Sequence, residues 1–469
     1  MGKHFNQSLD FNNMPKIFRL QATPRLYTIL AWLCFAELML LFAFLYASFI
    51  RIAFFQFDEF EFVKKGFFYE LFFLRHDATG PQWMNFENDP AQPKVGPYLY
   101  GATLSAAGYR DITAYFTRYD TFKKGMGVNW YEWLGKEPDQ LPEAVRSTLP
   151  LVFVGRWVSL GFTIAMLGVV FWLSRLIGGY LYGLVALALL GFNPLLLAHG
   201  VYAMTDTFLL FFFSAGLLTA LGFFRSLKSH EPRMRAQAYT FSILFGILCA
   251  LSAGVKVSGI LLFVFGLIGL VLLFLLPRAV VQEKKTLIAH ALIMTVTFVT
   301  VFIALHPFLY HQTFTRLPFM FTSRFEGELY YHTLYPATAV TSRVQALSLV
   351  VGRTLLPGGY GNFNVGGIPI DLVLFLTGVF LLGRTMYRSH RRTHQVADES
   401  ILLVWTTIVL ASIAAYLRND WPRYYLPSVM VVTLVEAYGI TVFLRGFRKL
   451  PDLLIPHAVN AFRRETQYL

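Results

Sequence analysis

The chain has 469 residues, of which 56% are hydrophobic and only 14% are charged. Because about a quarter of the residues of a soluble domain are charged, this composition excludes an ordinary soluble protein. The formal net charge of +13 would suit nucleic-acid binding, but the basic residues lie in short loops between apolar runs, where the positive-inside rule places them. The two cysteines, Cys34 and Cys249, lie inside apolar runs, which excludes a disulfide framework and a CxxC site.

Apolar runs of about twenty residues recur along the whole chain and predict an all-α polytopic membrane protein. Strands are excluded as the spanning element because the runs are continuous and do not alternate. The first run is too long for a cleavable signal peptide and is predicted to remain as an anchor. We expect about ten transmembrane helices of this length. They are predicted to begin near Tyr27, Leu151, Leu181, Phe208, Thr240, Gly259, Ile288, Ile370, Ile401 and Tyr425.

Two long loops interrupt the series of spans, at residues 55–150 and residues 306–369. Mixed polar and aromatic sequence such as "FVKKGFFYELFFL" predicts helices that lie along the membrane surface in these loops. The second loop also contains the turn-rich stretch "LLPGGYGNFNVGGIP". The sequence shows no convincing internal repeat and no separate soluble domain. Residues 1–469 are therefore interpreted as a single membrane-embedded domain.

The basic residues alternate consistently between the two sides of the predicted membrane. The loops "RSLKSHEPRMR", "PRAVVQEKK" and "RTMYRSHRR" and the tail that begins "RGFRK" fall on the N-terminal side, and all are basic. The tail before the first span carries Lys3, Lys16, Arg19 and Arg25. Since cytoplasmic loops carry an excess of Lys and Arg, both termini are predicted to be cytoplasmic. Both long loops then share the extracytoplasmic face.

Charged residues at the ends of spans are candidates for a functional site, because they are costly to place next to lipid. In the predicted topology, several from distant parts of the chain share the extracytoplasmic face. They are Asp58, Glu59, Asp206, Lys256, Arg418 and Arg423. Alternatively, Asp206 is a helix N-cap and Lys256 is a lysine whose ammonium group reaches the lipid headgroups. Arg156, near the same end of its span, either pairs with a carboxylate or binds an anion.

Motifs for several other chemistries do not occur in the sequence. There is no P-loop, no GxGxxG, no GxSxG and no HExxH, so nucleotide-driven transport and dinucleotide chemistry have no support. His306 and His311 lie near each other in the sequence, but their spacing does not match a known metal-ligand pattern.

Five motifs follow one another along most of the chain. The acidic pair Asp58-Glu59 follows the first span, and a degenerate "NDPAQPKVGPYLYG" precedes the second. Next come Arg156 with the block "YGLVALALLGFNPLLLAHGVYAMTDTFLLFF", the turn "GVKVSGI" and a late "RYYLP". In this order the motifs resemble those of the membrane glycosyltransferases of the C superfamily (GT-C). The resemblance is in particular to the protein O-mannosyltransferases and the aminoarabinose transferases.

This resemblance implies a glycosyltransferase whose donor sugar is linked to a polyprenyl or dolichyl phosphate. It implies that Asp58 is the general base that takes the proton of the acceptor hydroxyl, with Glu59 as a supporting acid. The residues implied to hold the leaving phosphate are Lys256, Arg423 and Arg156, with Asp206 in support. No organic cofactor is expected, and a divalent metal ion is optional. The expected partners are the lipid-linked donor, an acceptor protein, lipid or glycan, and membrane lipids, but no nucleic acid.

The first loop departs from the family pattern, because Gln92-Pro93-Lys94 replaces its usual proline–histidine approach, and this leaves sugar and acceptor open. The compact chain favours a bacterial inner membrane over the endoplasmic reticulum.

A transporter is an alternative function, but it needs polar residues near the middle of several spans, whereas most polar residues of the spans lie at one end here. A ligase or polymerase that uses lipid-linked sugars would share the cationic site without requiring Asp58 as a base. A structural scaffold would leave the Asp58-Glu59 pair unexplained.

Overall fold

The computed structural model describes residues 24–85, 89, 91–126, 136–229, 231–275, 284–363, 367–393 and 397–465. Within these ranges the regular elements are helices, and strand-like pairing is limited to one isolated bridge between Ala339 and Asn419. The all-α fold predicted from the apolar runs is therefore confirmed. Lys3, Lys16 and Arg19 of the predicted cytoplasmic tail lie outside the described residues.

Eight helices in the described ranges are long and apolar enough to cross a membrane, as expected for a multi-pass membrane protein. They are α1 (Pro24–Ile52), α7 (Leu149–Gly191), α9 (Asp206–Lys228), α10 (Pro232–Val255), α11 (Ile260–Leu275) together with the short helix before it (Val257–Leu275 in all), α12 (Lys284–Ala304), α15 (Ile370–Thr393) and α17 (Leu426–Glu465). Helix α16 (Ser400–Tyr416) is apolar but shorter. The difference from the ten predicted spans lies in α16 and in α7, which contains two of them.

The chain reverses its direction inside α7, at Gly179. This residue has φ 78° and ψ 178°, a conformation that suits glycine. A Cβ atom at Gly183 would lie 2.9 Å from the carbonyl oxygen of Phe171, although the same number of residues in a straight helix would rise about 18 Å. Farther along, the Thr163 hydroxyl donates a hydrogen bond of 2.6 Å to the carbonyl of Gly200. The two arms of α7 therefore run side by side in opposite directions.

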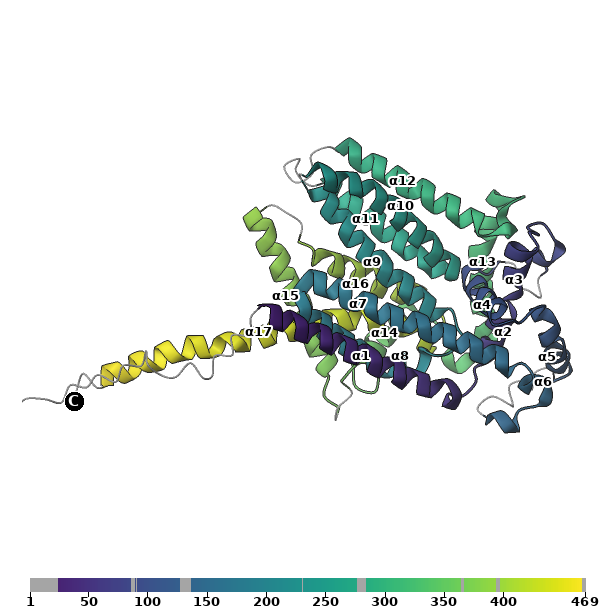
Figure 1. Ribbon diagram of the computed structural model, residues 1–469, viewed down its shortest axis with the longest axis horizontal. Helices are drawn as coiled ribbons and strands as arrows, with labels where there is room; N and C mark the ends of the chain where they lie inside the picture. The colour runs from purple at the N-terminus through teal and green to yellow at the C-terminus, as the bar shows by residue number, and fades with distance from the viewer. Residues whose placement is uncertain are drawn as a thin grey trace, which may run out of the picture.

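Shorter helices form the two long loops, as predicted. The first loop contains α2 (Phe57–Lys64), α3 (Phe67–Tyr69), η3 (Glu70–Leu74), η4 (Pro81–Trp83), α4 (Val95–Ala106), α5 (Ile112–Met126), η7 (Pro138–Gln140) and α6 (Glu143–Arg146). The second contains η9 (Pro307–Leu309), α13 (Thr313–Leu334), η10 (Pro336–Thr338) and α14 (Arg343–Leu355). The remaining connections include α8 (Pro194–His199), η8 (Val257–Gly259) and η11 (Pro422–Tyr425). Figure 1 shows α2 to α6 and α13 gathered at one end of the bundle, called the outer end below, opposite the end from which α17 extends.

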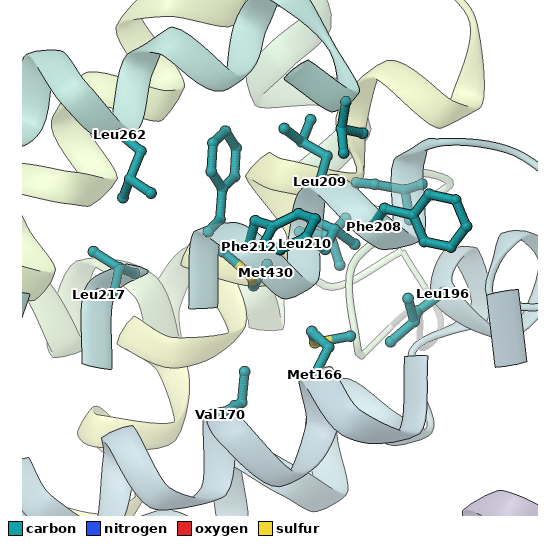
Figure 2. Close-up of a cluster of buried hydrophobic side chains, with 14 of the residues drawn as sticks. Met166, Val170, Leu196, Phe208, Leu209, Leu210, Phe212, Leu217, Leu262 and Met430 are labelled. Carbon is teal, nitrogen blue, oxygen red and sulfur yellow. The ribbon is translucent and has the colours of Figure 1, made fainter. Parts of the chain in front are cut away.

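The interior of the bundle is built around α9, which packs against α7, α10, α11 and α17. Figure 2 shows Met166 of α7, Leu210 of α9 and Met430 of α17 within one cluster of buried side chains, and each is only 1% exposed. A Cβ atom at Gly216 of α9 would lie 2.3 Å from Leu262 of α11, so glycine allows these two helices to touch. Close packing of this kind drives helix association in membranes.

Candidate active site

Four of the predicted site residues lie at the outer end, each next to a break between helices. Asp58 lies in the first turn of α2, and Asp206 begins α9. Lys256 separates α10 from η8, and Arg423 lies in η11, directly ahead of α17. The structure thus brings together residues from four distant parts of the chain.

These residues form two ion pairs beside the ring of Tyr424. Arg423 donates a hydrogen bond to the carboxylate of Asp58, and Lys256 donates one of 2.8 Å to Asp206. The Lys256 ammonium lies 5.2 Å from the centre of the Tyr424 ring, and the Arg423 guanidinium lies 5.5 Å from it. The side chains of Asp58 and Lys256 remain 35% and 24% exposed, so solvent reaches both. We call these four residues and Tyr424 the charged cluster.

The turn that carries Lys256 follows from the local sequence "GVKVSG". Lys256 has an extended conformation, with φ −152° and ψ 138°, which ends α10. Three residues later, a Cβ atom at Gly259 would lie 2.1 Å from the carbonyl oxygen of Ser252, so this close turn requires glycine. Lys256 is therefore held at the tip between two spans, where it meets Asp206.

The first outer loop holds the turn in front of Asp206. A Cβ atom at Gly96 of α4 would lie 2.5 Å from the Thr205 side chain, so α4 approaches this turn closely. One helical turn later, the Tyr100 hydroxyl donates a hydrogen bond of 3.0 Å to the carbonyl of Met204. Helix α4 therefore contributes to the charged cluster by fixing the residues that lead into α9.

Glu59 and Arg156 form a separate ion pair in which both side chains are completely buried. The guanidinium group binds the two carboxylate oxygens at 2.8 Å each, from Nε and from Nη2. Its remaining donors contact the backbone carbonyls of Ile50, Ala53 and Phe54 at 2.7–3.0 Å. All the donors of Arg156 are directed at protein acceptors, so none remains to bind a ligand.

The carboxylate of Glu59 also accepts two backbone hydrogen bonds. The N–H of Ala203 donates to it at 2.9 Å, and the N–H of Gln56 does so at the same distance as part of a capping box at the start of α2. The ion pair thus ties the end of α1, the start of α2 and the turn before α9 to α7. Of the two adjacent acids, Asp58 faces the charged cluster and Glu59 faces the scaffold beneath it.

The second long loop, residues 306–369, forms hydrogen bonds with the segment just before Arg423. Arg353 of α14 binds both carboxylate oxygens of Asp420, at 2.6 and 3.3 Å, and the Tyr425 hydroxyl donates to the same carboxylate at 2.8 Å. The N–H of Asp420 donates to the carbonyl of Thr338 at 2.8 Å. Arg418, predicted to share the outer face, is held through its carbonyl, which accepts a hydrogen bond of 2.7 Å from the N–H of Val340. The position of Arg423 therefore depends on residues 336–355.

His199, the last residue of α8, lies beside the charged cluster and was missed by sequence reasoning. Burial lowers the pKa of His199 to about 4, while Asp206 raises it and Arg423 lowers it further. Its Nδ1 is buried and has no hydrogen-bond partner in the described part of the chain. The block "LAHGVYAMTD" places this histidine shortly before Asp206, which is a signal that could have identified it.

Within the described ranges, no three His, Cys, Asp or Glu side chains gather in a way that could hold a metal ion. His306 instead links the first loop to α12. Its Nε2 accepts a hydrogen bond of 3.3 Å from the N–H of Lys94, and its Nδ1 lies 2.6 Å from the carbonyl of Phe302. Burial lowers the pKa of His306 to about 4, so the ring is neutral and structural.

Residues 91–315 match the family model of the dolichyl-phosphate-mannose-protein mannosyltransferases. This segment contains Arg156, Asp206 and Lys256, and the match confirms the resemblance to the membrane glycosyltransferases of the C superfamily. No curated protein matches the sequence.

Among solved structures, the chain is similar to the archaeal oligosaccharyltransferase AglB from Archaeoglobus fulgidus in complex with an inhibitory peptide and a dolichol-phosphate. The sequence identity is 12%, the TM-score is 0.48, and the similarity covers 89% of this chain and 51% of that one. The apo form of the oligosaccharyltransferase from the same organism gives 13% identity, a TM-score of 0.48 and coverage of 89% and 52%. The chain spans about half the length of these solved chains.

Proposed function

We propose that the protein transfers a sugar from a polyprenyl- or dolichyl-phosphate donor to an acceptor hydroxyl at the extracytoplasmic face of a membrane. The description of the matched family favours mannose as the sugar and a protein as the acceptor. The observation that carries the proposal is the charged cluster, in which two cations and a solvent-accessible carboxylate meet at the outer end of the bundle. A donor whose lipid tail lies between spans would present its phosphate at this level.

The reaction needs a base, and Asp58 is suited to the role. Its side chain is the most exposed of the four charged side chains in the cluster, so an acceptor hydroxyl can approach the carboxylate. The acceptor oxygen attacks the anomeric carbon and passes its proton to Asp58, while the bond from that carbon to the phosphate oxygen breaks. The products are the glycosylated acceptor and the lipid phosphate, so no nucleotide is consumed.

Arg423 and Lys256 are the proposed phosphate ligands. Each donates one hydrogen bond to a carboxylate. A guanidinium carries five N–H donors and an ammonium three, so donors remain for phosphate oxygens. Arginine can bind the phosphate with two parallel hydrogen bonds, and lysine acts as a point charge. Both cations would stabilise the negative charge that develops on the leaving group. Asp206 supports the site by holding Lys256.

Donor binding and activation of the base are coupled in this scheme. In the structure Arg423 is paired with Asp58. When phosphate oxygens compete for the guanidinium, the carboxylate is released from part of that interaction and becomes a better proton acceptor. The base is then most effective when the donor is in place.

Glu59 and Arg156 have a different proposed role from the one implied by the resemblance. Every donor of Arg156 already binds a carboxylate or carbonyl, and neither side chain reaches solvent. We therefore assign them to the scaffold that positions Asp58 and Asp206, without contact to the phosphate.

The test uses the purified protein in nanodiscs, with dolichyl phosphate mannose and a threonine-containing peptide. The expected result is release of dolichyl phosphate and formation of a mannosylated peptide, both reduced at least tenfold by Lys256→Ala. Lys228→Ala is the matched control, because Lys228 forms a comparable ion pair of 3.0 Å with Asp398 far from the charged cluster. Failure of the wild-type protein to bind or turn over the donor would overturn the proposal, as would equal effects of the two substitutions.

A further inference from the structure

The Nδ1 atom of His199 lacks the hydrogen bond that a buried polar atom normally makes. The side chain is partly buried, and Nδ1 is shielded from solvent without a hydrogen-bond partner among the described residues. Most buried polar groups in folded proteins have partners, because a missing hydrogen bond costs free energy. A ligand that supplies the missing hydrogen bond to Nδ1 would remove this cost. Helix α8, which ends at His199, packs against η11, which contains Arg423, so this residue lies next to the charged cluster.

The local structure fixes His199 in this position. Asn193 caps α8, because its side-chain oxygen accepts hydrogen bonds from the N–H groups of Leu195 and Leu196 at 3.0 and 3.2 Å. At the other end of α8, the carbonyl of Gly200 accepts the 2.6 Å hydrogen bond from Thr163. A Cβ atom at Gly200 would lie 2.6 Å from the Tyr46 ring, so the chain is tightly packed there. The backbone of His199 is thus held between two anchored residues.

We propose that His199 hydrogen-bonds a hydroxyl group of the substrate at the charged cluster. This inference rests on the proposed glycosyl transfer and adds a residue that recognises the uncharged part of a substrate. A sugar hydroxyl both donates and accepts hydrogen bonds, so it can satisfy an imidazole in either tautomer. The partner can be a hydroxyl of the donor sugar or of the acceptor.

The chemistry of the ring favours a hydroxyl over the phosphate. Burial lowers the pKa of His199 to about 4, so the imidazole carries no charge at neutral pH. A neutral ring adds little to phosphate binding where Lys256 and Arg423 already supply two positive charges.

The decisive variants are His199→Phe and His199→Asn. Phenylalanine keeps a flat ring but has no polar atoms, so the folded protein should be as stable as wild type or more stable. Asparagine keeps a donor and an acceptor near Nδ1 and should retain part of the function. The matched control is His290→Phe, because His290 is a buried histidine of α12 whose Nδ1 is bonded to Ser242 at 2.8 Å. That variant should lose stability without a specific change in substrate affinity.

Binding and turnover are measured in nanodiscs with three probes: dolichyl phosphate, dolichyl phosphate mannose and a threonine-containing peptide. If His199 contacts the donor sugar, His199→Phe should weaken binding of dolichyl phosphate mannose about three- to tenfold and leave dolichyl phosphate binding unchanged, as expected for one neutral hydrogen bond. If it contacts the acceptor, donor binding should be normal and the KM for the peptide should rise by a similar factor.

Two outcomes would overturn the inference. Unchanged binding and turnover in His199→Phe would mean that only water satisfies the ring. A loss of stability in this variant, together with equal weakening of all three probes, would mean that His199 only supports the fold. Failure of the proposed function is distinguishable, because the wild-type protein would then bind neither lipid, and the inference would fall with it.

Discussion

Glu59→Gln tests whether the two adjacent acids have separate roles. The substitution keeps the size of the side chain but leaves the Arg156 guanidinium, which is 0% exposed, without its counter-charge. In the wild type the two carboxylate oxygens of Glu59 accept hydrogen bonds of 2.8 Å from the Arg156 guanidinium. The glutamine amide has only one oxygen, and its NH2 group would face a guanidinium N–H. Breaking a buried ion pair by removing one partner costs about 3–5 kcal/mol. We therefore expect a large loss of stability from a change that preserves shape.

Asp58→Asn is the matched comparison at the neighbouring position. The Asp58 side chain is 35% exposed and its partner Arg423 is 19% exposed. Such a partly exposed pair contributes on the order of 1 kcal/mol or less to stability. Loss of a general base, in contrast, lowers the rate by about a hundredfold or more. Asp58→Asn should therefore fold normally and be nearly inactive.

Both variants are assayed in the same detergent by thermal unfolding and size-exclusion chromatography, and the folded fraction of each is assayed for turnover. Binding of dolichyl phosphate mannose reports whether the site is intact. The expected pattern is low stability for Glu59→Gln and low turnover with normal stability for Asp58→Asn. If Glu59→Gln were as stable as wild type but as inactive as Asp58→Asn, Glu59 would take part in the chemistry and its assignment to the scaffold would be refuted.

Three further predictions concern the loops and the buried histidine. Arg353→Gln should lower kcat/KM by about tenfold, because it releases Asp420 and with it the segment that carries Arg423, whereas Arg353→Lys should recover part of the loss; equal activity of the glutamine variant and wild type would contradict this. A cysteine at Tyr335 should be labelled from the extracytoplasmic side only, and labelling from the cytoplasm would reverse the topology. Because burial lowers the pKa of His306 to about 4 while the unfolded chain keeps the ordinary value, the unfolded state binds more protons between these values. Stability should therefore fall by up to about 3 kcal/mol as pH drops from 6.5 to 4, and His306→Asn should reduce this dependence.

Hydropathy and charge could predict which residues lie at the outer end, because both are properties of single segments. Apolar length determines where a span can begin, and the placement of basic loops determines which ends share a face. Asp206, Lys256 and Arg423 could be selected in this way, and the structure places them together. The reversal at Gly179 lies two residues before the predicted start of the span at Leu181, so hydropathy also located the boundary between the two arms of α7.

The partners of each charge could not be predicted, because they depend on how distant segments pack. Arg353 and Asp420 lie in different elements, and nothing in either local sequence indicates the other. The same holds for His199, whose significance comes from missing partners, and missing partners can be recognised only in three dimensions. Sequence reasoning therefore identified charges that gather at one end of the bundle, but could not divide them between chemistry and scaffold.

The pair Asp58-Glu59 shows how such a division arises from helix geometry. Neighbouring residues on a helix point about 100° apart, so two adjacent acids at the start of α2 cannot both face the same partner. Glu59 lies at the third position of α2, where its carboxylate caps the N–H of Gln56 and is directed toward Arg156. Asp58 is thereby turned toward Arg423 and solvent. The spacing from Gln56 to Glu59 is that of a capping box, a local signal for assigning the second acid to the scaffold. An acidic pair at this position therefore supplies one carboxylate that builds the site and one that remains accessible to a substrate.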